Sequence, residues 1–252
     1  MKRILATLAI IVMVTSTLFA ATLSANQIMA KVIDTQKADS AALDLKLTLI
    51  EANGTQRERR IQTLSKTVGD DTSSITVFLS PESVRNTRFL SKEVNGQTEQ
   101  YIYLPALKRV KRIASSEEGG SFMGSDFSYA DMASTTYDTD EAVHTLLGED
   151  ATTYTVQSIP NKKTVYGKNV VVVDKSNFLP IRVEFYDLDG KTLLKTLVTE
   201  EQEYVGARPI TKSITMTTVA TGHATRLEIV QARYDMLISD NYFTQKFLET
   251  GR

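Results

Sequence analysis

Short apolar or alternating runs separated by turn dipeptides constrain this chain more than any other feature of its sequence. The clearest turn dipeptides are Asn53-Gly54, Asn95-Gly96 and Asp189-Gly190. Such pairs tolerate the positive φ angles of tight hairpin turns, so each joins two antiparallel strands. This pattern predicts a mainly β fold built on one large antiparallel sheet. The predicted strands cover residues 41–50, 55–66, 75–79, 87–94, 97–104, 153–159, 165–174, 180–187, 191–199, 204–205, 210–219 and 224–234.

Helical patterns are few. Residues 24–35 predict a first helix with Ser24 as its N-cap, residues 140–147 a short helix, and residues 241–248 a closing helical turn. A large sheet must curl, close or be covered to bury its apolar face. Residues 101–104 are apolar on both faces of their strand, which needs cover on each side. We therefore expect a curled sheet with a covered cavity on one side.

The N-terminus has the order of a secretory signal peptide. Lys2-Arg3 precedes an apolar run over residues 4–14, and small residues follow at positions 20, 21, 24 and 25. The run is shorter than the ~20 apolar residues that span a bilayer, so cleavage is favoured over an uncleaved anchor. Cleavage after Ala20 and cleavage after Ala25 are both open. The sequence thus predicts a signal peptide over residues 1–25 and a single domain over residues 26–252.

Charge and cysteine content exclude several classes of protein. Removing Lys2 and Arg3 from 29 basic residues leaves 27 against 30 acidic ones, a net charge of −3. No domain-wide positive field exists, so nucleic acid is not an expected partner. The absence of cysteine excludes disulfide-stapled scaffolds and lipid attachment through a thioether. We expect the processed protein to lie free in the periplasm, beyond the inner membrane.

Catalytic signals are sparse. The chain has two histidines, and both are predicted to be solvated: His144 in an acidic helical segment and His223 in a hairpin turn. No glycine-rich phosphate loop, HExxH or G-x-S-x-G motif occurs. Ser125 and Asp126 form a conceivable nucleophile and carboxylate, but no base is assigned to them, and Asp126 is favoured as a turn or helix N-cap. We expect no enzyme, no cofactor and no metal site.

A glycine-rich loop over residues 119–127 carries large apolar side chains where polar ones are usual. The sequence supports two interpretations about equally. These side chains cap one end of the core, or they cover a cavity that binds a ligand. Acyl chains suit such a cavity, because each buried CH₂ contributes about 0.8 kcal/mol without directional contacts. The candidate lipid-binding residues are Phe78, Phe89, Tyr101, Tyr103, Phe122, Met123 and Phe127.

A short basic run precedes this loop. It also has two interpretations, which stay open. Basic side chains solvate an edge or loop and deter edge pairing, or they dock anionic headgroups or an acidic partner at roughly 1 kcal/mol each. The candidate docking residues are Lys108, Arg109, Lys111 and Arg112.

Several segments resemble the LolA-like outer-membrane lipoprotein-sorting family. They are FLSPESVRNTRFLS, YLPALKRVKRIASS, SFMGSDFSYADM, VVVVDKSNFLPIRVEFYDLDGKTLLKT and FTQKFLETG, in this order. The resemblance implies an unclosed, strongly curved antiparallel β-barrel whose concave apolar face is covered by helices and a loop. It looks closest to a bacterial branch found beside lipid-exporting membrane transporters. The GSDF stretch has no counterpart in the better-studied carrier, so that carrier's functional arginine is not transferred to Arg57, Arg59 or Arg60.

The leading hypothesis is therefore a non-enzymatic periplasmic carrier that shelters acyl chains of lipids or lipoproteins for transport or sorting to the outer membrane. An inner-membrane transporter and an outer-membrane acceptor are its candidate partners. The competing hypothesis is a periplasmic adaptor that docks on a transporter or envelope complex without lipid cargo. A continuous apolar pocket of several hundred Å³ is expected of the carrier, and a packed interior of the adaptor.

Overall fold

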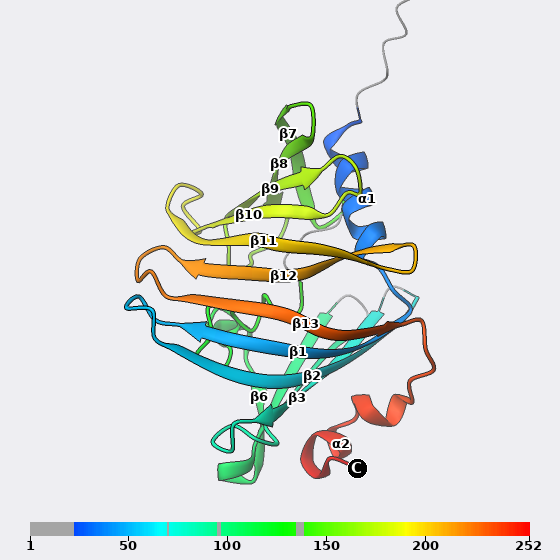
Figure 1. Ribbon diagram of the computed structural model, residues 1–252, viewed down its shortest axis with the longest axis vertical. Coiled ribbons are helices and arrows are strands. Elements are labelled where there is room, and N and C mark those ends of the chain that lie inside the picture. The colour runs from blue at the N-terminus through cyan, green and yellow to red at the C-terminus, as the bar shows by residue number, and fades with distance from the viewer. Residues whose placement is uncertain (1–22, 70, 95–96, 135–138) are drawn as a thin grey trace, which may run out of the picture.

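The computed structural model describes residues 23–69, 71–94, 97–134 and 139–252, which form a mainly β protein with few helices (Figure 1). The helices are α1 Ala25–Gln36 and α2 Gln245–Thr250, with short 3-10 turns η1 Pro105–Leu107, η2 Ser115–Glu117 and η3 Asp240–Phe243. The strands are β1 Ser40–Ile50, β2 Gln56–Val68, β3 Asp71–Ser80, β4 Arg88–Val94, β5 Gln97–Leu104, β6 Arg109–Ile113, β7 Ala142–Glu149, β8 Thr153–Pro160, β9 Lys168–Asp174, β10 Pro180–Tyr186, β11 Leu193–Val205, β12 Arg208–Thr218 and β13 Ala224–Tyr234.

All of these strands belong to one antiparallel sheet of 13 strands, with the order β6-β5-β4-β3-β2-β1-β13-β12-β11-β10-β9-β8-β7. Two meanders, β1–β6 and β7–β13, are joined side by side where β1 pairs with β13. The sheet is strongly curved but not closed into a barrel, because β6 and β7 are its two edges (Figure 1). These edges are consecutive in the chain, so the segment between them has to cross from one half of the sheet to the other.

The predicted turns form the expected hairpins. Gly54 adopts a φ of 85° between β1 and β2, and Gly190 a φ of 65° between β10 and β11, a region open to glycine without strain. In the β4–β5 hairpin, Val94 pairs with Gln97, which leaves two residues for the turn. Those two, Asn95-Gly96, lie outside the described residues. Local turn chemistry is therefore sufficient to place these strand pairs.

The inner face of the sheet carries two apolar clusters. We call the first the α1 core, because Ile28, Met29 and Val32 of α1 pack there against strands β8 to β12. Ser24 caps α1 as predicted: its hydroxyl accepts from the Gln27 N–H at 3.3 Å, and the Gln27 side chain accepts from the Ser24 N–H at 2.9 Å. We call the second the hairpin core, formed by Leu45, Leu47, Leu49, Ile61, Phe78, Phe89, Ile102, Ile113 and Phe122.

The outer face of strands β3 to β5 carries a third, smaller cluster beneath the C-terminal segment. Ile75 and Leu90 meet Phe243 and Leu248 there. Arg88 fastens this segment, because its Nη1 donates to the Leu248 carbonyl at 2.8 Å. The β3, β4 and β5 strands are thus covered on both faces, which the apolar pattern of residues 101–104 predicts for β5.

Two predictions about secondary structure, a helix near residues 140–147 and separate strands over residues 191–199 and 204–205, are wrong. Residues 142–149 form β7, an edge strand, and not a helix, because Ala142 and His144 point inward at a period of two. The basic run, expected at an edge or in a loop, is the edge strand β6, since Arg109 to Ile113 pair with β5. The strands predicted over residues 191–199 and 204–205 are one long strand, β11, which begins at Leu193 and continues through register shifts near Glu201.

In the described part of the chain, no helix is both long enough and apolar enough to cross a membrane. The predicted hydrophobic segment of the signal peptide, residues 4–14, lies outside the described residues.

Candidate functional site

The segment that crosses from β6 to β7 carries the glycine-rich stretch, and we call residues 119–132 the crossing loop. It contains no helix or long strand and lies against the inner face, bridging both halves of the sheet. Phe122 belongs to the hairpin core, Phe127 belongs to the α1 core, and Met132 packs against both. The loop therefore fills the space that the curved sheet encloses.

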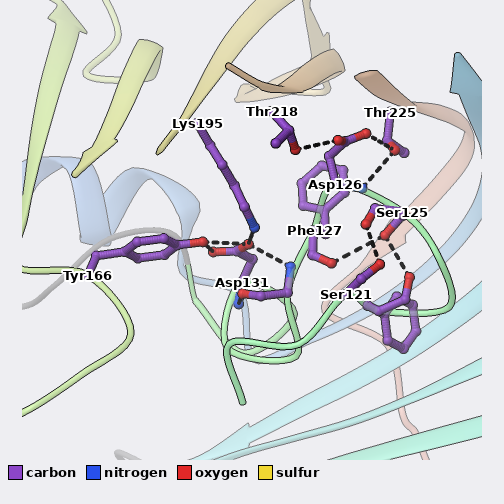
Figure 2. Close-up of polar contacts among 11 residues, drawn as sticks. Ser121, Ser125, Asp126, Phe127, Asp131, Tyr166, Lys195, Thr218 and Thr225 are labelled. Carbon is purple, nitrogen blue, oxygen red and sulfur yellow. Dashed lines mark hydrogen bonds and ion pairs between the residues drawn. The ribbon is translucent and has the colours of Figure 1, made fainter. Parts of the chain in front are cut away.

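Short-range hydrogen bonds give the crossing loop a defined shape. The Phe122 N–H donates to the Phe127 carbonyl at 2.7 Å, and the Ser125 hydroxyl donates to the Phe122 carbonyl at 2.7 Å. The Ser121 hydroxyl donates to the Ser125 carbonyl at 2.6 Å. Gly124 supplies the tight turn with a φ of 77°. The serines are thus used by the loop's own backbone, as Figure 2 shows.

Four of the predicted lipid-binding residues gather in one place. Phe78, Phe89 and Phe122 are almost fully buried, and the Phe122 ring lies 5.8 Å and 5.1 Å from those of Phe78 and Phe89. The Tyr129 ring joins them at 5.7 Å from the Phe122 ring. Met123 packs half-buried against the same cluster. The enclosed space here is filled by side chains, which is the packed interior that the adaptor hypothesis expects.

The other three predicted lipid-binding residues lie elsewhere. Tyr101 and Tyr103 alternate with Ile102 along β5, so they face the outer cluster beneath the C-terminal segment. Phe127 is buried in the α1 core. The sequence pattern alone does not show which face of β5 points inward. In the structure the two tyrosines point outward, away from the buried phenylalanines.

Asp126 ties the crossing loop to the middle of the sheet. Its carboxylate accepts from the Thr218 hydroxyl at 2.5 Å and from the Thr225 hydroxyl at 2.7 Å, and it lies 2.6 Å from Nδ1 of His223. Figure 2 shows the two threonine contacts. Of the two roles predicted for Asp126, it lies in a turn, closed by the bond between Phe122 and Phe127, and it caps no helix. The predicted solvation of His223 is wrong. The partners of Asp126 are about ninety residues away in the sequence, so no local signal reveals the contact.

Asp131 makes the second tie. Its buried carboxylate accepts from the Tyr166 hydroxyl at 3.0 Å and lies 3.3 Å from Nζ of Lys195 (Figure 2). Within the loop, the same carboxylate accepts from the Ser128 N–H at 2.7 Å. Only 1% of the Asp131 side chain and 16% of the Lys195 side chain are exposed. A buried charge is costly to leave unpaired, so this pair fixes the end of the crossing loop against β11.

Arg59 makes the third tie, from strand β2. Its Nη1 donates to the Met123 carbonyl at 2.6 Å, and its guanidinium lies 5.9 Å from the centre of the Phe78 ring. Burial, together with the neighbouring Arg57, lowers the pKa of Arg59. No local signal reveals this contact, because the partner of Arg59 is a backbone carbonyl 64 residues along the chain.

The remaining polar candidates have structural partners. The Ser125 hydroxyl donates to backbone carbonyls and not to a histidine. His144 is buried on β7, where Nδ1 lies 2.8 Å from the Ser158 hydroxyl, so its predicted solvation is wrong. These contacts hold loops and strands of the sheet together.

The basic run lies on the exposed edge strand and the turn before it. Lys111 pairs with Glu117 at 2.5 Å, and Arg112 pairs with Glu99 at 3.3 Å. Lys108 and Arg109 are exposed. The four predicted docking residues therefore share one edge of the sheet, and two of them are neutralised by glutamates of the same chain.

Comparisons with known proteins agree on the fold. A family model described as an uncharacterized protein matches residues 70–250. A crystal structure from Vibrio parahaemolyticus, described as an outer membrane lipoprotein-sorting protein domain, is 29% identical, with a TM-score of 0.82 over 89% of this chain and 98% of that one. A DUF1329 family protein from Desulfovibrio piger is 26% identical, with a TM-score of 0.83 over 89% and 97%.

A LolA superfamily protein from Nitrosomonas europaea has the same fold at 21% identity, with a TM-score of 0.72 over 90% of this chain and 100% of that one. A search of curated proteins finds no match. The predicted mainly β, unclosed and LolA-like architecture is confirmed.

Proposed function

This chain belongs to the family whose model matches residues 70–250, and we propose that it is a non-enzymatic periplasmic carrier of acyl chains. The likeness to solved structures described as an outer membrane lipoprotein-sorting protein domain and as a DUF1329 family protein supports this proposal. In this proposal a signal peptide is cleaved after Ala20, so that Ser24 and Ala25 stay with α1, and the rest of the chain is a single carrier domain. Cargo passes from an inner-membrane transporter to an outer-membrane acceptor, and no nucleic acid takes part.

One observation carries the proposal: the inner face of the sheet is covered by helix α1 and the crossing loop and not by a second sheet. The apolar space is occupied by the side chains of Phe122, Phe127 and Met132, which a loop of about fourteen residues holds there. An acyl chain offers the same apolar contacts without needing directional ones. The acyl chain therefore replaces these side chains in the apolar space, and the crossing loop moves aside as the chain enters.

The size of the cargo follows from the ties that hold the loop. Each hydrogen bond to a charged group contributes roughly 1.5–3 kcal/mol, and Arg59, Asp126 and Asp131 make several. A chain of about fourteen methylenes gains on the order of 11 kcal/mol on burial, and a chain of about six only ~5 kcal/mol. The free energy gained by burying a long acyl chain can thus offset the free energy lost when these polar contacts break. Burial of a short chain cannot.

The test is native mass spectrometry of the mature protein from its own compartment, together with uptake of fluorescent fatty acids of two lengths. We expect co-purified lipid and uptake of the long probe. The absence of both would overturn the carrier proposal.

A pair of variants separates cargo binding from folding. Phe122→Ala vacates space under the loop and should increase uptake of the long probe, whereas Phe243→Ala, a matched buried phenylalanine on the outer face, should not. Phe122→Asp places a charge in the same space and should weaken uptake more than folding. Equal losses of uptake and thermal stability in Phe122→Asp would favour a core-capping loop.

The packed inner face favours a second candidate, a periplasmic adaptor that carries no cargo. In that case exposed Lys108 and Arg109 dock an anionic surface, supported by Lys111 and Arg112. Reversing the charge of Lys108 and Arg109 should abolish binding to vesicles rich in anionic lipid. Binding that survives this reversal contradicts docking through the basic edge.

A further inference from the structure

One end of the sheet brings a glutamate and a histidine together. Ile50 of β1 pairs with Ala224 of β13, so the next residues outward, Glu51 and His223, lie opposite each other. Figure 1 shows the two turns that carry them, β1–β2 and β12–β13, side by side at the left of the view. His223 Nε2 is 3.9 Å from Glu51 Oε2, and 19% and 39% of the two side chains are exposed. The two atoms are too far apart for a direct hydrogen bond, and solvent reaches both side chains.

Asp126 decides which nitrogen of the His223 ring carries the hydrogen. Its carboxylate, which is 3% exposed, offers only acceptors, and it already accepts from the Thr218 and Thr225 hydroxyls. His223 Nδ1 lies 2.6 Å from the same carboxylate and therefore donates to it. In the neutral ring this leaves Nε2 as an acceptor. Two acceptors, Nε2 and the Glu51 carboxylate, thus face each other across 3.9 Å.

Both acceptors are held in place by further contacts. A histidine that binds a metal usually donates its other ring N–H to a carboxylate, and metal-binding carboxylates are themselves hydrogen-bonded. Asp126 fills the first role for His223. Arg57 fills the second, because its Nη2 donates to Glu51 Oε1 at 2.5 Å and leaves Oε2 on the side of the histidine. The His223 N–H donates to the Thr221 hydroxyl at 3.2 Å, which fixes the turn itself.

We propose that His223 Nε2 and Glu51 Oε2 together bind a zinc ion. Imidazole nitrogen and carboxylate oxygen are both zinc ligands, and the two carboxylates at this site outnumber its one guanidinium. Bonds of roughly 2.0–2.2 Å place two ligands of a tetrahedral zinc about 3.4 Å apart, so Glu51 has to close by about 0.5 Å. In the described part of the chain no third histidine or carboxylate joins this pair as a ligand, so water completes the coordination. The site does not depend on acyl-chain carriage.

The proposed site is linked to the crossing loop through Asp126. Zinc on Nε2 draws electron density from the ring, which makes Nδ1–H a stronger donor to the Asp126 carboxylate. A ligand that binds better to one state of a protein shifts the equilibrium toward that state. Zinc should therefore hold the crossing loop in place, and hydrogen exchange of residues 120–132 measures this without any cargo.

The experiment titrates the full mature protein, made without a histidine tag, with Zn²⁺ and follows the ring nitrogens of the two histidines by NMR. The His223 signals should shift, whereas those of His144, which is buried beside Ser158, should not. With two protein ligands we expect a dissociation constant on the order of 10–100 μM. Mg²⁺, which prefers oxygen ligands, is the control. No shift of His223 at millimolar Zn²⁺, or an equal shift with Mg²⁺, overturns the proposal and leaves a water molecule or a proton as the bridge.

Variants make the result specific to this pair. Glu51→Gln leaves the contact between Asp126 and His223 intact and should weaken zinc binding at least about tenfold, since losing even a group that only positions a ligand costs about 10–100-fold. Glu58→Gln, at an exposed glutamate of β2, is the matched control and should leave zinc binding unchanged. Equal affinities in the two variants contradict the assignment.

Hydrogen exchange tests the link to the loop. Saturating Zn²⁺ should slow the exchange of residues 120–132 in the wild type and not in His223→Ala, which lacks the ring. The comparison is made within each variant, with and without zinc, so a general loss of stability in His223→Ala does not affect it. Zinc that shifts the His223 signals without slowing this exchange contradicts the link through Asp126.

Discussion

Phe122 and Phe127 share a 2.7 Å backbone hydrogen bond, yet their side chains are buried in different cores. The Phe122 ring packs with Phe78 and Phe89 from the hairpins of the first half of the sheet. The Phe127 ring packs with α1 and the strands of the second half. One tight turn of the crossing loop therefore connects the two halves of the inner face, and displacing it would uncover both.

The Thr225 hydroxyl should control how easily the crossing loop opens. It accepts from the Asp126 N–H at 2.9 Å and donates to the Asp126 carboxylate at 2.7 Å. Thr225→Val should cost about 1–3 kcal/mol, because it leaves polar partners unsatisfied in a buried site. Hydrogen exchange of residues 120–132 should become faster. Thr76→Val is the matched control: Thr76 is also buried and bonds the Thr63 hydroxyl, away from Asp126. If both variants raise the hydrogen-exchange rate of the loop equally, the cause is a general loss of stability and not the loss of the contact with Asp126.

Arg59→Lys should loosen the loop from the other half of the sheet. Lysine keeps the charge but lacks the planar fork that reaches the Met123 carbonyl and covers the Phe78 ring. We expect a loss of about 1 kcal/mol in urea unfolding, together with faster uptake of the long fatty-acid probe. Arg57→Lys, at the exposed ion pair with Glu51, should change stability by no more than ~0.5 kcal/mol. Equal effects of the two variants would refute a specific role for Arg59.

Asp189 should make stability depend on pH in the acid range. In the β10–β11 turn its carboxylate accepts from the N–H groups of Thr192 and Lys191 and from the Thr192 hydroxyl, which lowers its pKa from 3.8 to about 2. A pKa lowered in the folded state stabilises the fold above pH 3.8, and this contribution is lost as the pH falls toward 2. Asp189→Asn should thus melt below the wild type at neutral pH, and the gap should close toward pH 2. A constant gap across this range contradicts the prediction.

Signal-peptide cleavage should occur after Ala20. A mature chain that begins at Ala21 keeps Ser24, whose hydroxyl caps α1, and Ala25, which is buried. A chain that begins at Asn26 loses both and should be about 1 kcal/mol less stable, as should Ser24→Ala. The intact mass of the exported protein gives the cleavage site directly. Ser116→Ala, at an exposed serine, is the control for the stability measurement. A mature N-terminus at Asn26, or an uncleaved chain, would contradict the assignment.

Much of the fold could be predicted because its signals are local. A period of two marks β1, turn dipeptides place the hairpins, and Ser24 marks the start of α1. Local signals failed where tertiary pairing decides the structure. The basic residues of β6 form a strand because β5 offers them an open edge. His144 faces inward on β7, because β8 pairs with that segment and gives it a partner in Ser158.

The sequence by itself determined the strand-rich composition, the tight turns, the capped first helix and the apolar loop at residues 119–132. It also supplied the phenylalanines that meet beneath the loop. Only the tertiary structure decided that β1 pairs with β13, that the loop crosses between the two edges, and that Asp126 reaches Thr218 and Thr225. Periodicity and turn chemistry act over a few residues, whereas these contacts join positions about ninety or more apart. Their geometry depends on how far the whole sheet curves.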